Sequence, residues 1–274
     1  GNIQNVYAQG FLGSRTNNLI NNATVSAAYV TTASTSLNAS YNYSIIRFGS
    51  SPSTQGLSLF DTTNQTGTVG GAARLSGLDT LNVKYAHMQT DRTPSSPTTS
   101  TTSSSFITDS ATIGWSRTLT PNLSAELGGG GILISPGITT YAANAALFMN
   151  SLNNSATISY SRSAFPNIAG VTGAGGTSGG ILIGDVFSLS AIQRIDRQWQ
   201  LAETANYAHT SGGSGLNSLT YNSFVAGGDI QYWVTSIWST ALSYNYTKFT
   251  NEFGSVKTDF DRQVITLSIR ATWE

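Results

Sequence analysis

The feature that most constrains this chain is an alternation of apolar and polar residues with a period of two, clearest in the C-terminal segment "DRQVITLSIRATWE". Every second residue from Ile265 to Trp273 is apolar, and Thr, Ser and Arg stand between them. Successive side chains of a β-strand point to opposite faces, so this pattern predicts a strand with one apolar and one polar face. The segments "SLNASYNYSI", "LNVKYAH" and "WSTALSYNYTK" repeat it. No segment has a convincing 3.6-residue period, so we expect an all-β fold.

The alternating segments are numerous and regularly spaced. We predict one domain, residues 1–274, of fourteen strands near 2–12, 22–31, 36–47, 66–76, 81–91, 106–118, 123–134, 138–150, 155–164, 180–194, 199–210, 217–234, 238–251 and 260–273. Short connections follow the second, fourth, sixth, eighth, tenth and twelfth strands. Longer segments rich in Ser, Thr, Gly and Pro follow most of the others, such as "GSSPSTQGLSLFDTTNQ" and "PNIAGVTGAGGTSGG". These residues are typical of turns and loops.

The composition excludes several classes of protein. Only 9% of the residues are charged, against about 25% in ordinary soluble domains. Thirteen basic and thirteen acidic residues cancel, which disfavours a nucleic-acid partner. The absence of cysteine removes disulfides and thiolate metal sites. No apolar run is long enough for a membrane helix, while 12 tyrosines, 11 phenylalanines and 5 tryptophans argue against disorder.

Strands of this kind suit a transmembrane, antiparallel, up-and-down β-barrel. A soluble sheet would usually carry Lys, Glu and Arg on its solvated face, and here that face carries Ser, Thr and Asn. A closed barrel satisfies every backbone group in lipid, with strands of about 9–11 residues. Short turns at one end and long loops at the other are typical of such barrels, whose strand number is even in bacteria. We therefore expect about 14 strands, with 12 and 16 as alternatives.

In this pattern the chain resembles bacterial outer-membrane β-barrel proteins of the porin-like kind, over essentially its whole length. The resemblance implies location in the outer-membrane lipid. It also implies a C-terminal strand, ending at Trp273, that is read by the barrel assembly machinery, although Glu274 follows this aromatic. More loosely, the chain is similar to barrels that accompany exopolysaccharide and exosortase systems. No signal peptide is visible and the first predicted strand starts near Gly1, so we expect a processed form without a plug domain.

Aromatic residues on the apolar face are expected to form two girdles, because amphipathic rings prefer the level of the lipid headgroups. The tryptophans near the short turns are Trp115, Trp199, Trp238 and Trp273. The tyrosines nearer the long loops are Tyr43, Tyr85, Tyr160, Tyr207, Tyr244 and Tyr246. The alternative is that these are core aromatics of a soluble β protein.

The polar face is expected to line a lumen, and fourteen strands should leave an aqueous pore unless something fills it. A few charges have inward parity: Arg74, Lys84, Glu126, Arg194, Asp229, Arg262 and Arg270. They are too few for a strongly ion-selective ring. The sequence thus predicts a porin-like pore or export conduit for neutral polar solutes or polysaccharide. In one alternative these charges pair within the wall. In another the barrel is a structural sleeve or anchor in a larger envelope complex.

Some residues break the pattern. Glu203 has the parity of the apolar face, where a charge in lipid is costly. We expect a register shift there first, and otherwise a contact with a second copy of the chain or an envelope partner. The glycine run in "LGGGGILI" (127–134) predicts curvature of the wall, or else a surface against which another segment packs.

No catalytic, cofactor or metal site is expected. The two histidines, His87 and His209, have outward parity near the long loops. A lipid-facing hydrolase could use such a position with neighbouring Ser and Asn, but these neighbours arise by chance in a chain so rich in both. "GAGGTSGG" lacks the Gly-Lys-Ser/Thr of a phosphate loop.

Overall fold

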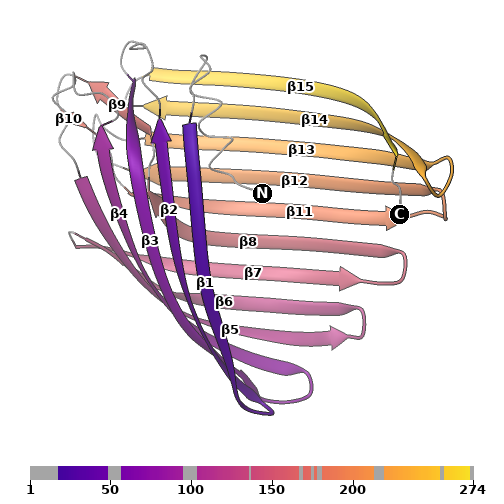
Figure 1. Cartoon of the computed structure of the whole chain (residues 1–274), viewed down its shortest axis with the longest axis horizontal. Coiled ribbons are helices and arrows are strands. Elements are labelled where there is room, and N and C mark those ends of the chain that lie inside the picture. The colour runs from indigo at the N-terminus through magenta and orange to yellow at the C-terminus, as the bar shows by residue number, and fades with distance from the viewer. Residues whose placement is uncertain are drawn as a thin grey trace.

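The computed structural model describes residues 18–48, 57–94, 104–135, 137–166, 169–173, 176–177, 181–212, 219–253 and 256–271. All regular structure in these ranges is β (Figure 1). No helix among the described residues is long and apolar enough to cross a membrane.

Thirteen strands follow one another in a single antiparallel sheet, in which each inner strand pairs with the strand on either side and β1 and β15 are the edges. They are β1 (Asn18–Thr32), β2 (Thr35–Phe48), β3 (Leu57–Arg74), β4 (Asp79–Pro94), β5 (Ser104–Thr120), β6 (Leu123–Ile134), β7 (Ile138–Asn150), β8 (Asn154–Pro166), β11 (Ile181–Arg194), β12 (Trp199–Gly212), β13 (Leu219–Trp233), β14 (Trp238–Phe253) and β15 (Val256–Ala271). They correspond in order to the second to fourteenth predicted strands. The first predicted strand, 2–12, lies outside the described residues. The predicted short connections are confirmed, since two to four residues join β1 to β2, β3 to β4, β5 to β6, β7 to β8, β11 to β12 and β13 to β14.

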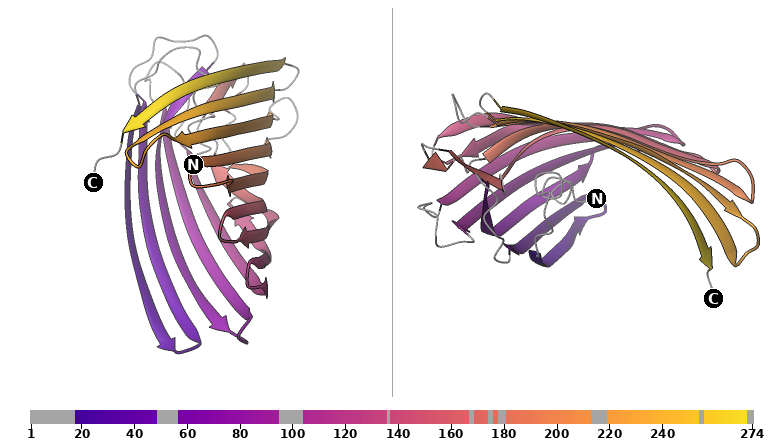
Figure 2. Two further views of the ribbon diagram at one scale, coloured as in Figure 1. Left: turned by 90° about the vertical axis from the view of Figure 1, so that its right-hand side faces the viewer. Right: turned by 90° about the horizontal axis from the view of Figure 1, so that it is seen from above.

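The sheet is strongly curved, like the wall of a barrel, and is open between β1 and β15 (Figure 2). Neighbouring strands alternate in direction, so the first and last of thirteen run the same way. One further strand between β1 and β15 would close the wall with antiparallel pairs throughout, and this gives the even number expected of a bacterial barrel. The fold is therefore an up-and-down antiparallel β-barrel wall, as the sequence predicted.

Two predicted loops contain more strand than expected. β3 begins at Leu57, so the segment 57–60, which was expected to be part of a loop, belongs to the strand. The segment expected as the loop "PNIAGVTGAGGTSGG" contains two short strands, β9 (Ala169–Gly173) and β10 (Gly176–Thr177), which pair with each other. β9 also pairs with the start of β3, with Leu57 opposite Val171.

The two faces of the sheet differ sharply. The pairing registers run from β1 to β15 with irregularities only near Thr32 and Thr120, so one face carries the apolar set throughout. This face is uncovered, and Val25 and Ile265 are each 73% exposed. Burial of such side chains stabilises a soluble fold by about 1.5–3 kcal/mol each, which leaves lipid as the natural cover for this face.

Buried side chains gather on the polar face and at one end of it. Apart from Ser239, they lie near the long-loop ends of their strands: Ile46, Thr62, Thr90, Arg92, Thr108, Ile132, Ile134, Leu182, Ala208, Thr210, Tyr221, Phe249 and Asn251. Packing therefore fills the polar side of the wall at the long-loop end.

Candidate channel wall and outer surface

Asparagines on the polar face lie against glycines of the neighbouring strand. The cross-strand pairs are Asn38 with Gly70, Asn82 with Gly114, Asn144 with Gly128, and Asn245 with Gly227. A Cβ added at Gly128 or Gly227 would lie 2.3 Å from the asparagine oxygen, and one added at Gly70 would lie 2.7 Å from it. The missing side chains thus let the amides lie flat along the wall, where they present neutral donors and acceptors.

Other polar side chains on this face are bonded to one another. The Asn42 amide donates to Thr24 Oγ1 at 2.7 Å. The Thr90 hydroxyl donates to Asn64 Oδ1 at 2.9 Å. Among the predicted charges, Glu126 accepts a hydrogen bond from the Asn144 amide at 3.1 Å. Each of these bonds joins polar side chains of two neighbouring strands.

The registers put all seven predicted charges on this polar face; for example, Arg194 pairs with Gln200 and Arg270 with Ser239. Within the described ranges none of the seven makes an ion pair. Asp229 and Arg270 line the same groove of about 240 Å³. Except for the half-buried Glu126, all are exposed. That they line a lumen stays a prediction.

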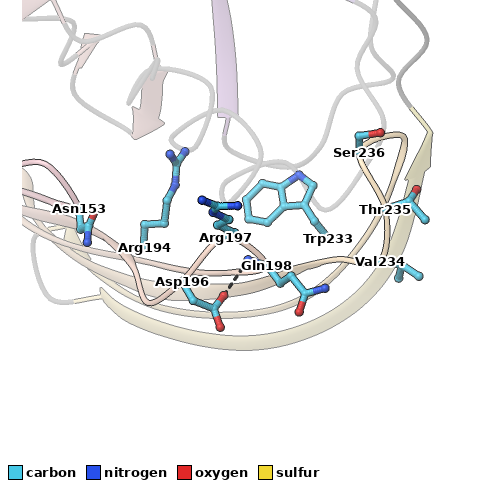
Figure 3. A pocket seen from close by; sticks show the side chains of 9 residues that line it. All are labelled: Asn153, Arg194, Asp196, Arg197, Gln198, Trp233, Val234, Thr235 and Ser236. Atoms are coloured by element: carbon cyan, nitrogen blue, oxygen red, sulfur yellow. Dashed lines mark hydrogen bonds between the residues drawn. The ribbon is translucent and has the colours of Figure 1, made fainter.

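A larger hollow of about 850 Å³ lies at the short-turn end. Its walls come from the turns after β11 and β13 (Figure 3). Asp196 shapes the first turn, because its carboxylate accepts the backbone N–H groups of Gln198 and Trp199 at 2.7 and 2.8 Å. Arg194, Arg197 and Trp233 project to the same side of the sheet (Figure 3). Sequence reasoning missed Trp233. It is three residues from the apolar-face residue Ile230 on the same strand, and this odd spacing would have placed it on the polar face.

The aromatic residues predicted for the girdles lie on the apolar face. Trp115 donates its indole N–H to Asp79 at 3.1 Å, and Trp199 packs against Tyr232 with ring centroids 4.6 Å apart. Trp238 is 48% exposed. Tyr43, Tyr244 and Tyr246 share this face by register, opposite Gln65, Ile265 and Gln263. Trp273 lies outside the described residues.

Three strands carry the same polar arrangement on the apolar face, and the sequence reasoning did not find it. A tyrosine and, two residues later, a cationic or imidazole side chain both bind an acceptor on the next strand. On β4 and β5, Tyr85 and His87 bind Asp109 at 2.6 and 2.8 Å. Asp109 has the parity of the apolar face and stands directly opposite His87. An acid on that face was a signal in the sequence that it has a polar partner on the next strand.

The other two copies lie close together. Tyr160 and Arg162 of β8 bind Asp185 of β11 at 2.7 and 2.5 Å. The equivalents on β12 and β13 are Tyr207 and His209, which bind Asn222 Oδ1 at 3.2 and 2.7 Å.

The histidines do not form a hydrolase triad in the described part of the chain. His87 Nδ1 is bound to the Asp109 carboxylate and His209 Nδ1 to the Asn222 amide oxygen, which is how the third member of a triad would orient an imidazole. Ser211 follows His209 by two residues on the same face, but no hydroxyl among the described residues is hydrogen-bonded to either imidazole. Nor do these residues include a cluster of three or more His, Cys, Asp or Glu side chains fit for a metal ion.

Glu203 lies on the apolar face without any register shift. β12 pairs continuously with both neighbours, and Glu203 stands between Ala191 and Gly228. The expected bulge is therefore wrong. The side chain is exposed in a surrounding of small residues that includes Ala205.

One glycine of the run 128–131 lies very close to the backbone of the neighbouring strand. A Cβ at Gly130 would lie 1.9 Å from the Ala111 carbonyl oxygen of β5, whereas one at Gly131 would meet nothing within 4 Å. The close approach therefore comes from β5, and whether the run also serves curvature of the wall stays a prediction.

No protein-family model matches the sequence, and no curated protein matches it. Solved structures do. The chain is similar to the ferric enterobactin receptor PfeA of Pseudomonas aeruginosa, with a TM-score of 0.53 and 13% identity, over 98% of this chain and 56% of that one. It also matches OmpT of Vibrio cholerae, as a loop-deletion mutant, with a TM-score of 0.41 and 10% identity, over 92% and 90%. The ferric yersiniabactin uptake receptor FyuA of Yersinia pestis matches with a TM-score of 0.47 and 12% identity, over 86% and 43%.

The chain thus spans about half the length of the two siderophore receptors, 56% of PfeA and 43% of FyuA. At such identities the likeness concerns the fold alone: this chain has the fold of bacterial outer-membrane β-barrel proteins. Together with the uncovered apolar face, this fold indicates location in the outer membrane.

Proposed function

We propose that the chain is a passive outer-membrane channel for neutral polar solutes or an uncharged polysaccharide. The observation that carries the proposal is the polar face, with its flat asparagine amides and its exposed charges outside any ion pair. A wall of this kind exchanges hydrogen bonds with hydroxyl-rich solutes and has no strong net field.

The distribution of burial gives the channel a direction. The buried side chains lie at the long-loop end of the polar face, including Ile132, Tyr221 and Phe249. The 850 Å³ hollow lies at the opposite end. Since long loops of such barrels are extracellular and short turns periplasmic, the path is constricted outside and widens towards the periplasm.

Swelling of vesicles in solutions of neutral sugars tests this function. Vesicles that contain the folded protein should swell with a small neutral sugar and more slowly as the sugar grows. An equally small charged sugar acid should give a similar rate. Vesicles that stay closed to every neutral sugar would overturn the proposal.

A second candidate is a structural sleeve or anchor in a larger envelope complex, and Glu203 favours it. A carboxylate on the lipid side is destabilising unless a partner supplies a donor, and the small neighbours Ala191 and Gly228 leave room for close approach. A sleeve requires no open pore, so purified protein that is folded but impermeable would favour this candidate. In that case Glu203→Gln should weaken co-assembly in the native envelope, while Lys248→Gln, at the long-loop end of the same face, should not.

A further inference from the structure

The apolar face carries a two-tier patch near the long-loop ends of four neighbouring strands. Its lower row is a line of rings, Tyr160, Phe187, Tyr207 and Phe224, directly opposite one another in register. Neighbouring centroids are 4.8 Å apart for the first two and 6.5 Å for the next two. The upper row, two residues nearer the long-loop end of each strand, is Arg162, Asp185, His209 and Asn222.

Hydrogen bonding within the patch leaves donors in excess. Both Asp185 oxygens already accept, from Tyr160 and Arg162. Asn222 Oδ1 is bound by Tyr207 and His209. Among the described residues, no partner binds the Asn222 amide N–H groups or Arg162 Nη2, whereas Arg162 Nε is buried. The guanidinium also stacks 4.4 Å from the Tyr141 ring centre. The patch therefore suits a ligand rich in acceptors.

The position of the patch limits what that ligand is. Its lower row is aromatic and faces lipid, and such rings settle where acyl chains meet headgroups. The upper row lies about 7 Å higher, and four strands span about 14 Å, which is the size of a headgroup with its phosphate. An arginine fixed by a second partner is a good phosphate donor because its geometry is set in advance.

We propose that this two-tier patch is a binding site for the phosphate-bearing headgroup of an anionic lipid in the leaflet at the long-loop end. Arg162 and Asn222 donate to the phosphate, and the ring row holds the upper acyl chains. The site is on the outer surface of the barrel and is independent of any solute path through it.

The chain supplies its own control. Tyr85 and His87 bind Asp109 in a similar way at the same end of the sheet, but no arginine takes part and Tyr85 stands opposite Val69 and Ala111. It therefore lacks the row of rings and the arginine. If a polar cluster alone were enough, both places would bind lipid.

The test is native mass spectrometry of the full chain in an uncharged detergent, with phosphatidylglycerol added in steps. The Arg162→Gln/Asp185→Asn double variant removes both charges together and keeps an acceptor for Tyr160. It should weaken retention of phosphatidylglycerol about tenfold. The His87→Gln/Asp109→Asn double variant should stay within about twofold of the parent. Retained fold is checked by the shift in gel mobility on heating, and Asn222→Ala serves if the first variant does not fold.

Equal retention by the parent and Arg162→Gln/Asp185→Asn would overturn the proposal. An equal loss of phosphatidylglycerol retention in His87→Gln/Asp109→Asn would also overturn it, since any polar cluster at that level would then bind the lipid. Inorganic phosphate that displaces the lipid completely at millimolar concentration would show a free-anion site instead. Equal retention of an uncharged glycolipid would remove the phosphate from the assignment.

Discussion

The two adjacent glycines in β6 give the sharpest test of the packing of the wall. Gly130 and Gly131 are neighbours in sequence and face opposite sides of the sheet, and neither has a positive φ. A methyl group at Gly130 would overlap the Ala111 carbonyl oxygen at 1.9 Å and the Thr112 Cα at 2.7 Å. Both atoms are backbone, so β5 itself has to move. At Gly131 there is open space.

The expected magnitudes have opposite signs. Overpacking of this kind costs about 1–3 kcal/mol, so Gly130→Ala should lower the free energy of unfolding by at least that amount. Gly131→Ala should raise it by about 0.4–1 kcal/mol, because alanine loses less backbone entropy on folding. The assay is urea unfolding from phosphatidylcholine vesicles, followed by tryptophan fluorescence. Equal effects of the two substitutions, or a stable Gly130→Ala, would refute the close approach of β5 and β6.

Three further outcomes follow from the same structure. Asp229→Asn/Arg270→Gln should change the cation-to-anion permeability ratio by less than about twofold, since the two opposite charges share one groove and cancel; a tenfold change in reversal-potential measurements would show that they form a selectivity filter. The chain has no cysteine of its own, so engineered pairs can be crosslinked by oxidation. If residues 2–12 form the closing strand, Ile265→Cys should crosslink with single cysteines introduced one at a time through 2–12. Crosslinking of Ile265→Cys with cysteines in β1 instead would contradict this. The protein should release no fatty acid from ester lipids, and release that Ser211→Ala abolishes would reveal a hydrolase.

Much of the fold could be predicted because the period-two pattern is a direct consequence of strand geometry in two different environments. The ends of the thirteen wall strands were predicted within a few residues, except the start of β3, which lies at Leu57 in a segment rich in Ser, Thr, Gly and Pro that was expected to be a loop. The short strands β9 and β10 were missed because "AGVTGAGGT" is rich in glycine and has no clear alternation.

Parity also predicted the face of the seven charges with inward parity and of Glu203, but not which charges meet. The pairing of Arg162 with Asp185 depends on the stagger between β8 and β11, and a single strand does not encode this stagger. Glu203 shows the opposite error. Its parity correctly placed it on the apolar face. The bulge was expected only because a charge in lipid is costly, and the continuous register of β12 keeps the charge on that face.

The central claim is that the polar face lines an open path, and single-channel recording in a planar bilayer tests it most directly. The purified, folded protein should give steady conductance with weak ion selectivity, and added neutral sugars should reduce the current in a concentration-dependent way. Folded protein that stays electrically silent would contradict the open path and would favour the structural sleeve.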